Sequence, residues 1–188
     1  MNVQPLGFYE LARASHVKRW HIINTTKEQN LAEHQYNVTV IGLELYKQIT
    51  GEPPTAVFMS ALLFHDSSEI RYGDIPTSGK AFIQMYTTDS NLFGAMDSNI
   101  MPELLYVDHP HPAPASEYGR LVKLADLIEA AWWIRENGAG AHAASVADKC
   151  YRAMVDMIHR TGYYDAANHI LMNLGMPIVC AAERLTPP

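Results

Sequence analysis

An apolar run in the first half of the chain ends in polar groups that are able to bind a metal ion. Residues 62–70 read Leu-Leu-Phe-His-Asp-Ser-Ser-Glu-Ile, which brings His65 next to Asp66 and places Glu69 three residues further on. A buried carboxylate has to be paired or metal-bound, because an isolated charge is costly away from water. Imidazole and carboxylate ligands together suit Zn, Mn, Co or Fe better than Ca. The alternative is a helix end at which His65 caps carbonyl groups and Asp66 is solvated.

Two more residues of the same types lie in apolar helical segments. His34 belongs to an apolar stripe within residues 28–49, and Asp126 interrupts an apolar segment within residues 120–136. Each also has an ordinary explanation: a core histidine bonded to a carbonyl group for His34, and a buried cap or ion-pair partner for Asp126. With the His65-Asp66 pair they form the ordered pattern H…HD…D, in which each member lies on a separate helix or helix end.

The elements that would position these groups are helices. Residues 18–26 are expected to be extended without a partner strand, residues 71–80 to form a loop beside the metal, and residues 107–114 to connect helices. The prediction is an all-α protein of five to seven helices with no convincing strand pair. Apolar spacing, with Gly51 and Gly162 as terminators and Thr55 and Ser145 as caps, predicts helices over residues 5–18, 28–49, 56–70, 81–101, 120–136, 146–161 and 164–174.

Length and composition restrict the classes of partner. The 188 residues fit one domain, residues 1–188, that can bury a substantial core. The net charge of −6 does not attract nucleic acid or an anionic membrane, so any phosphate site must be a local basic spot. Cys150 and Cys180 lack metal-binding spacing and are typical of a reducing cytoplasm. We therefore expect a soluble cytoplasmic protein, and its Met-rich and aromatic helix faces favour a homo-oligomer.

Several short motifs, taken in order, resemble the HD-domain phosphohydrolase superfamily. More closely, they resemble the bacterial 5′-deoxynucleotidase branch typified by YfbR and a phage branch of DatZ-like dATP triphosphohydrolases. The likeness covers residues 5–160, with His21 in place of a proline of the bacterial branch and a shorter segment over residues 81–160. The motifs are Arg19-Trp20, Glu33-His34, His65-Asp66-Ser67-Ser68-Glu69, Gly73-Asp74-Ile75-Pro76-Thr77 and Lys123-Leu124-Ala125-Asp126.

This resemblance implies a role for each matching residue. It implies a compact HD-domain helical bundle that holds one divalent transition metal, Zn, Co or Mn. A continuous helix over residues 56–70 would place Glu69 one turn from His65, where Glu69 can act as a base and Asp74 as an acid. The implied metal ligands are His34, His65, Asp66 and Asp126, the implied acid/base pair is Glu69 and Asp74, and the residues near the substrate are Arg19, Trp20, Ile22, Thr77 and Lys80.

The resulting hypothesis is a metal-dependent hydrolase that cleaves the bond between the 5′-oxygen and the α-phosphorus of a small deoxynucleotide. The compact chain and the segment Trp20-His21-Ile22 favour a dATP triphosphohydrolase that releases deoxyadenosine and triphosphate. One alternative is a 5′-deoxynucleotidase that releases phosphate from monophosphates. Two others are a non-catalytic nucleotide-binding regulatory module and a phosphodiesterase with a second metal. No nucleic acid polymer or membrane is expected as a partner.

Overall fold

The computed structural model describes residues 4–88, 92–93 and 116–181, and it confirms the all-helical class. The predicted helix 81–101 lies partly, and the predicted connection 107–114 wholly, outside the described residues. Among those residues, none of the helices has the length and hydropathy of a membrane span. The elements are α1 (Phe8–Leu11), η1 (Ala14–His16), β1 (Lys18–Arg19), β2 (Gln29–Asn30), α2 (Leu31–Thr50), α3 (Ala56–Phe64), α4 (Glu69–Tyr72), α5 (Thr77–Met85), α7 (Glu117–Asn137), α8 (Gly140–Thr161) and α9 (Tyr164–Asn173).

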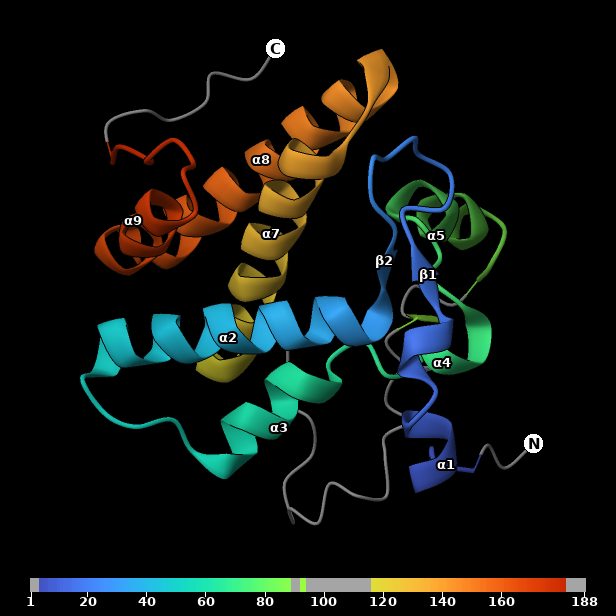
Figure 1. The fold of residues 1–188 in the computed structure, drawn as a ribbon. Coiled ribbons are helices and arrows are strands. Elements are labelled where there is room, and N and C mark those ends of the chain that lie inside the picture. Colours follow the sequence, from blue (N-terminus) through green and yellow to red (C-terminus); the bar gives the residue numbers. More distant parts are fainter. Residues whose placement is uncertain (1–3, 89–91, 94–115, 182–188) are drawn as a thin grey trace.

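Helix α2 is the central element and contacts α3, α7 and α9 (Figure 1). It begins at a capped turn, where the Asn30 side chain accepts a hydrogen bond from the Glu33 backbone N–H at 3.0 Å. It ends at Gly51, whose φ of 71° is a left-handed conformation that favours glycine. The strands β1 and β2 lie at the N-terminal end of α2, and beyond its C-terminal end the chain turns into α3 (Figure 1).

The core forms where the later part of α2 packs against α3, α7 and α9, and where α8 packs against α7 and α9. Leu45 and Phe58 are fully buried there, and the Tyr46 ring lies 5.0 Å from the Phe58 ring, centroid to centroid. Helices α2 and α3 approach closely at Gly42, because a Cβ atom at that position would collide with the Leu62 side chain. This close packing fixes the end of α3, and with it the turn that carries His65.

A short antiparallel ladder corrects the prediction that residues 18–26 have no partner strand. Lys18 pairs with Asn30, and Arg19 pairs with Gln29. Each strand has only two residues, which is too short for the alternation of apolar and polar side chains that reveals a strand in a sequence. The ladder places Arg19 and Gln29 opposite each other at the N-terminal end of α2.

The predicted continuous helix over residues 56–70 is also wrong. Helix α3 ends at Phe64, and residues 65–68 form a turn before α4 starts at Glu69. Within the turn the backbone N–H of Ser67 donates to the carbonyl of Phe64 at 3.1 Å, which is the tighter spacing of a 3-10 turn. Glu69 is thus placed by a separate one-turn helix.

Two helix starts differ from their predictions. Helix α5 begins at Thr77, so Lys80 lies on a helix and not in the predicted loop 71–80. Helix α8 begins at Gly140, without the predicted Ser145 cap, because Gly140 adopts a φ of 85° directly after α7 and lets the chain reverse. The predicted terminator Gly162 is confirmed with a φ of 74°.

Candidate metal centre and active site

Four predicted ligands from three parts of the fold converge on one point. His34 comes from α2, His65 and Asp66 from the turn after α3, and Asp126 from α7. One ligand atom from each of them lies within 4.8 Å of all the others. Two imidazole nitrogens and two carboxylate oxygens form a donor set that suits a divalent transition metal.

Both histidines present the Nε2 atom to this point because Nδ1 is already occupied. The Nδ1 atom of His34 lies 2.7 Å from Oε2 of Glu129, and that of His65 lies 2.9 Å from the Leu62 carbonyl oxygen. An acceptor at Nδ1 requires a proton there, so in the neutral ring, the form that binds a metal, the lone pair is on Nε2. Both Nε2 atoms are buried without a hydrogen-bond partner. Such orphaned acceptors fit ligation of a metal ion.

The two carboxylates are ionised, as ligation requires. Burial opposes ionisation of Asp66, but the neighbouring His65 and His34 rings and the Arg19 guanidinium hold its pKa well below the usual range. Burial likewise opposes ionisation of Asp126, and the Lys123 ammonium, 2.6 Å from its Oδ2, lowers that pKa. Both groups are therefore carboxylates at neutral pH.

Glu69 is buried beside the cluster, between two cations. Its Oε1 lies 3.2 Å from Nζ of Lys80, and its Oε2 lies 3.6 Å from Nη1 of Arg19. Burial, followed by the charge of Asp66, raises the pKa of Glu69 to about 8, although Arg19 and Lys80 oppose the shift. A carboxyl group with a pKa near neutrality can exchange protons in either direction.

The other predicted site residues differ in their burial and in their contacts. Asp74 is half-buried in the loop before α5, and its charge acts on both Arg19 and Glu69. Thr77 is exposed at the first residue of α5, and Ile22 is 56% exposed in the turn after β1. The Trp20 ring stacks on Trp133 with centroids 5.8 Å apart. Neither Ile22 nor Thr77 belongs to the group of clustered ligand residues.

Sequence reasoning missed two buried polar residues behind the cluster. Glu129 is fully buried and binds His34, and Gln29 donates from Nε2 to Oε1 of Glu129 at 2.6 Å. The signal for Glu129 was present, since it is a charge within an apolar helix, three residues after Asp126 and so on the same face. Gln29 gives no such signal, because it is distant from Glu129 in the sequence and contacts it only in the folded chain.

The ordinary explanations of the ligand residues are partly correct as well. His65 does cap a carbonyl group, but with Nδ1, so its Nε2 remains directed at the cluster. Asp126 does have an ion-pair partner in Lys123. His34 binds a carboxylate and not the carbonyl group expected of a simple core histidine.

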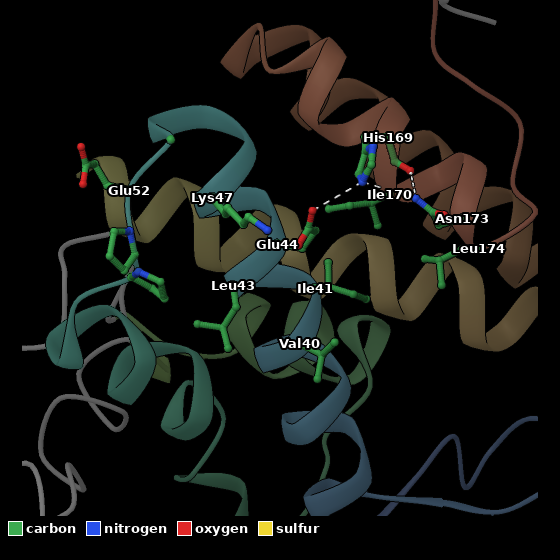
Figure 2. A pocket seen from close by; sticks show the side chains of 13 residues that line it. Val40, Ile41, Leu43, Glu44, Lys47, Glu52, His169, Ile170, Asn173 and Leu174 are labelled. Atoms are coloured by element: carbon green, nitrogen blue, oxygen red, sulfur yellow. Dashed lines mark hydrogen bonds and ion pairs between the residues drawn. The ribbon is translucent and has the colours of Figure 1, made fainter.

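A separate cavity of about 860 Å³ lies at the other end of α2, beside α9 (Figure 2). Its wall is largely apolar, and the four clustered residues do not line it. Lys47 faces the cavity together with Glu44 and Glu52, so the lining has no excess of positive charge that would attract a phosphate group. The chemistry therefore belongs to the cluster and not to this cavity.

Known proteins share this sequence and this fold. Residues 8–159 match the family model described as 5′-deoxynucleotidase YfbR-like. A dATP triphosphohydrolase of Cyanophage S-2L is 34% identical over 148 residues, which cover 78% of this chain and 79% of that protein. The 5′-deoxynucleotidase PM0747 of Pasteurella multocida is 29% identical over 132 residues, covering 63% of this chain and 67% of that protein.

Solved structures agree with the family match. The Cyanophage S-2L HD phosphohydrolase DatZ, bound to dA and one catalytic Zn²⁺ ion, superposes with a TM-score of 0.71 and 29% identity, covering 91% of this chain and 97% of that one. An HD-domain phosphohydrolase from Listeria innocua, at 14% identity and a TM-score of 0.55, shows the fold alone and covers 90% of this chain and 89% of its own. The protein described here belongs to the 5′-deoxynucleotidase YfbR-like family and has the helical fold of the HD phosphohydrolases.

Proposed function

We propose that this protein hydrolyses dATP to deoxyadenosine and triphosphate, with one zinc ion held by His34, His65, Asp66 and Asp126. The observation that carries the proposal is the convergence of these four side chains beside the buried acid Glu69. The Cyanophage S-2L relative that is 34% identical bears the name dATP triphosphohydrolase, which supports the choice of substrate. Co²⁺ or Mn²⁺ would satisfy the same donor set.

The metal supplies Lewis acidity, which acidifies water and polarises a phosphoryl oxygen. The chain's own contribution is to orient the reacting groups and to move protons. Glu69 accepts the proton of the attacking water at its carboxylate, because a bound cation, like Arg19 and Lys80, favours its ionised form. Asp74 donates a proton to the departing 5′-oxygen. Glu69 thus serves as the general base and Asp74 as the general acid.

Binding of the phosphate groups falls to Arg19 and Lys80. Both cations lie next to Glu69, so they supply local positive charge in a chain whose net charge is −6. Arg19 offers a planar pair of donors that suits a phosphate, and Lys80 acts as a point charge on the helix α5. Thr77 at the start of α5, with Trp20 and Ile22 after β1, would complete the site for sugar and base.

The test is the product spectrum of zinc-loaded protein with dATP, dAMP, ATP and dGTP, followed by ³¹P NMR. The proposal expects inorganic triphosphate from dATP and slower or no release from dGTP and ATP. Phosphate from dAMP, without triphosphate from dATP, would replace the proposal by the second candidate, a 5′-deoxynucleotidase. That candidate is favoured by the family description and by the P. multocida relative.

A non-catalytic nucleotide-binding module is a weaker candidate, because Glu69 and Asp74 beside a metal serve no purpose in simple binding. We also propose that the protein acts in the cytoplasm, where free deoxynucleotides are found, and that it self-associates. Exposed apolar side chains such as Phe82, Met85 and Tyr86, on or next to α5, support self-association. Light scattering of the purified protein would measure the oligomer.

A further inference from the structure

A chain of hydrogen bonds runs from Trp20 to His34 through two buried side chains. The indole N–H of Trp20 donates to Oε1 of Gln29 at 2.8 Å, and Nε2 of Gln29 donates to Oε1 of Glu129 at 2.6 Å. Oε2 of Glu129 then lies 2.7 Å from Nδ1 of His34. Asn37 adds a third donor to Glu129 at 3.1 Å.

Trp20 fixes the direction of the first two bonds in this chain. An indole nitrogen can only donate, so the oxygen of the Gln29 amide must face Trp20 and its nitrogen must face Glu129. Glu129 is then surrounded by donors from Gln29, Asn37 and His34. As a carboxylate, Glu129 accepts from Gln29 and Asn37 at Oε1 and from Nδ1 of His34 at Oε2. The proton of the His34 ring is thereby held on Nδ1.

The backbone of Trp20 shows that the segment is held in place by these contacts. Its φ of 58° is the positive-φ exception among the non-glycine residues that the structure describes. A left-handed conformation is costly for such a residue, so its surroundings must compensate. The hydrogen bond to Gln29 and the stacking on Trp133, at an interplanar angle of 3°, are the compensating contacts.

We propose that Glu129 is a positioning residue that fixes the tautomer and ring orientation of His34. Trp20 supports this role by fixing the orientation of the Gln29 amide, so that the amide nitrogen donates to Glu129. The inference rests on the proposed metal site, because the oriented atom is Nε2 of His34. Partners behind a ligating histidine commonly change metal affinity about 10- to 100-fold when they are removed. Trp20 thus affects the metal site without touching it.

The experiment compares zinc affinity in Glu129→Gln, Trp20→Phe and the matched control Glu136→Gln. Glu136 is exposed and lies two turns further along α7. Competition with a chromophoric chelator, without substrate, should show about 10- to 100-fold weaker zinc binding for Glu129→Gln and no change for the control. Trp20→Phe keeps an aromatic ring for stacking but loses the N–H, and should weaken binding about 3- to 10-fold.

A second measurement separates positioning from loss of structure. In metal-free protein with ¹⁵N-labelled histidine, kept at a pH at which the His34 ring is neutral, the His34 shifts, assigned from the His34→Asn variant, should report a proton on Nδ1 and none on Nε2 in the parent chain. That signature should be lost or mixed in Glu129→Gln. Zinc binding of Glu129→Gln and Trp20→Phe equal to the parent, with an unchanged His34 tautomer, would overturn the inference. If Glu129→Gln does not fold, Trp20→Phe decides alone. Absence of zinc binding in the parent chain would overturn the metal site itself.

Discussion

The two ends of α2 are buried among different kinds of side chain, charged at the N-terminal end and apolar at the C-terminal end. At the N-terminal end His34 is fully buried among charged groups. Its ring nitrogens lie 2.7 Å from the Glu129 carboxylate and within 3.5 Å of the carboxylates of Asp66 and Asp126. At its other end Leu45 is equally buried among apolar side chains. Burial of apolar area is favourable almost wherever it occurs, whereas buried charge is tolerated only with specific partners. The polar end therefore carries the chemistry, and the apolar end carries the stability.

The largest effect should follow removal of a ligand at the polar end. We expect His65→Ala to abolish tight zinc binding and to lower kcat/KM for dATP by ~10³-fold or more, since the metal contributes several kcal/mol to the transition state. Circular dichroism should show an intact fold, because the His65 side chain lies at the end of α3 and outside the apolar core. Activity within tenfold of the parent would contradict the assigned ligand set.

The next largest effect should separate catalysis from metal binding. Glu69→Gln keeps the size of the side chain but cannot take a proton, so kcat should fall about 10²- to 10⁴-fold. Zinc affinity should stay close to that of the parent, because Glu69 is not among the clustered ligand atoms. Glu28→Gln, at an exposed position, is the control. Equal turnover of Glu69→Gln and this control would remove Glu69 from the mechanism.

At the apolar end we expect a stability effect without a chemical one. Leu45→Ala leaves a cavity in the core and should lower the free energy of unfolding by about 2–5 kcal/mol. Urea denaturation in the presence of a chelator measures this change. Zinc affinity of the folded variant should be unaltered. A loss of zinc affinity with little loss of stability would show that the two ends are not independent.

A smaller effect should appear in the pH dependence of metal-free protein. The folded chain raises the pKa of Glu69 from its ordinary value to about 8, so between about pH 4.5 and pH 8 the folded state holds a proton that the unfolded state releases. Stability must then fall as the pH rises, by about 1–2 kcal/mol from about pH 6 to about pH 7.5. Glu69→Gln should flatten this slope in chelator-treated samples. An identical slope in both proteins would contradict the shifted pKa.

The smallest effect is expected beside the apolar cavity. Glu44 lies 3.4 Å from His169 at a site where both side chains are more than a third exposed. An exposed ion pair contributes little, so Glu44→Gln should change the free energy of unfolding by less than about 0.5 kcal/mol. Turnover of dATP should be unaffected. A clear loss of turnover would give this cavity a part in the reaction.

The sequence predicted the long elements well because their signals are local. The apolar spacing from His34 to Leu45 and the terminators Gly51 and Gly162 depend on neighbours a few residues away. The ligand pattern was also visible, since each member is a polar group in an apolar setting. The break after Phe64 was not visible, because it depends on a side-chain bond from His65 and on close packing of α3 at Gly42.

The network behind the metal could not be predicted because its members are distant in sequence. Gln29 and Glu129 are 100 residues apart, and neither has a spacing that points to the other. The ladder that pairs Gln29 with Arg19 is too short to be recognised. Trp20 was expected beside the substrate, whereas the structure also ties its indole N–H to the interior. Such contacts become apparent only once the helices are placed.

The most direct test of the account is a crystal structure of zinc-loaded Glu69→Gln protein with dATP, phased to locate zinc by its anomalous signal. The account predicts a peak at about 2.0–2.2 Å from Nε2 of His34 and His65 and from carboxylate oxygens of Asp66 and Asp126. The α-phosphate of dATP should lie against it, beside Arg19 and Lys80. Zinc bound elsewhere, or dATP bound in the cavity between α2 and α9, would contradict the account.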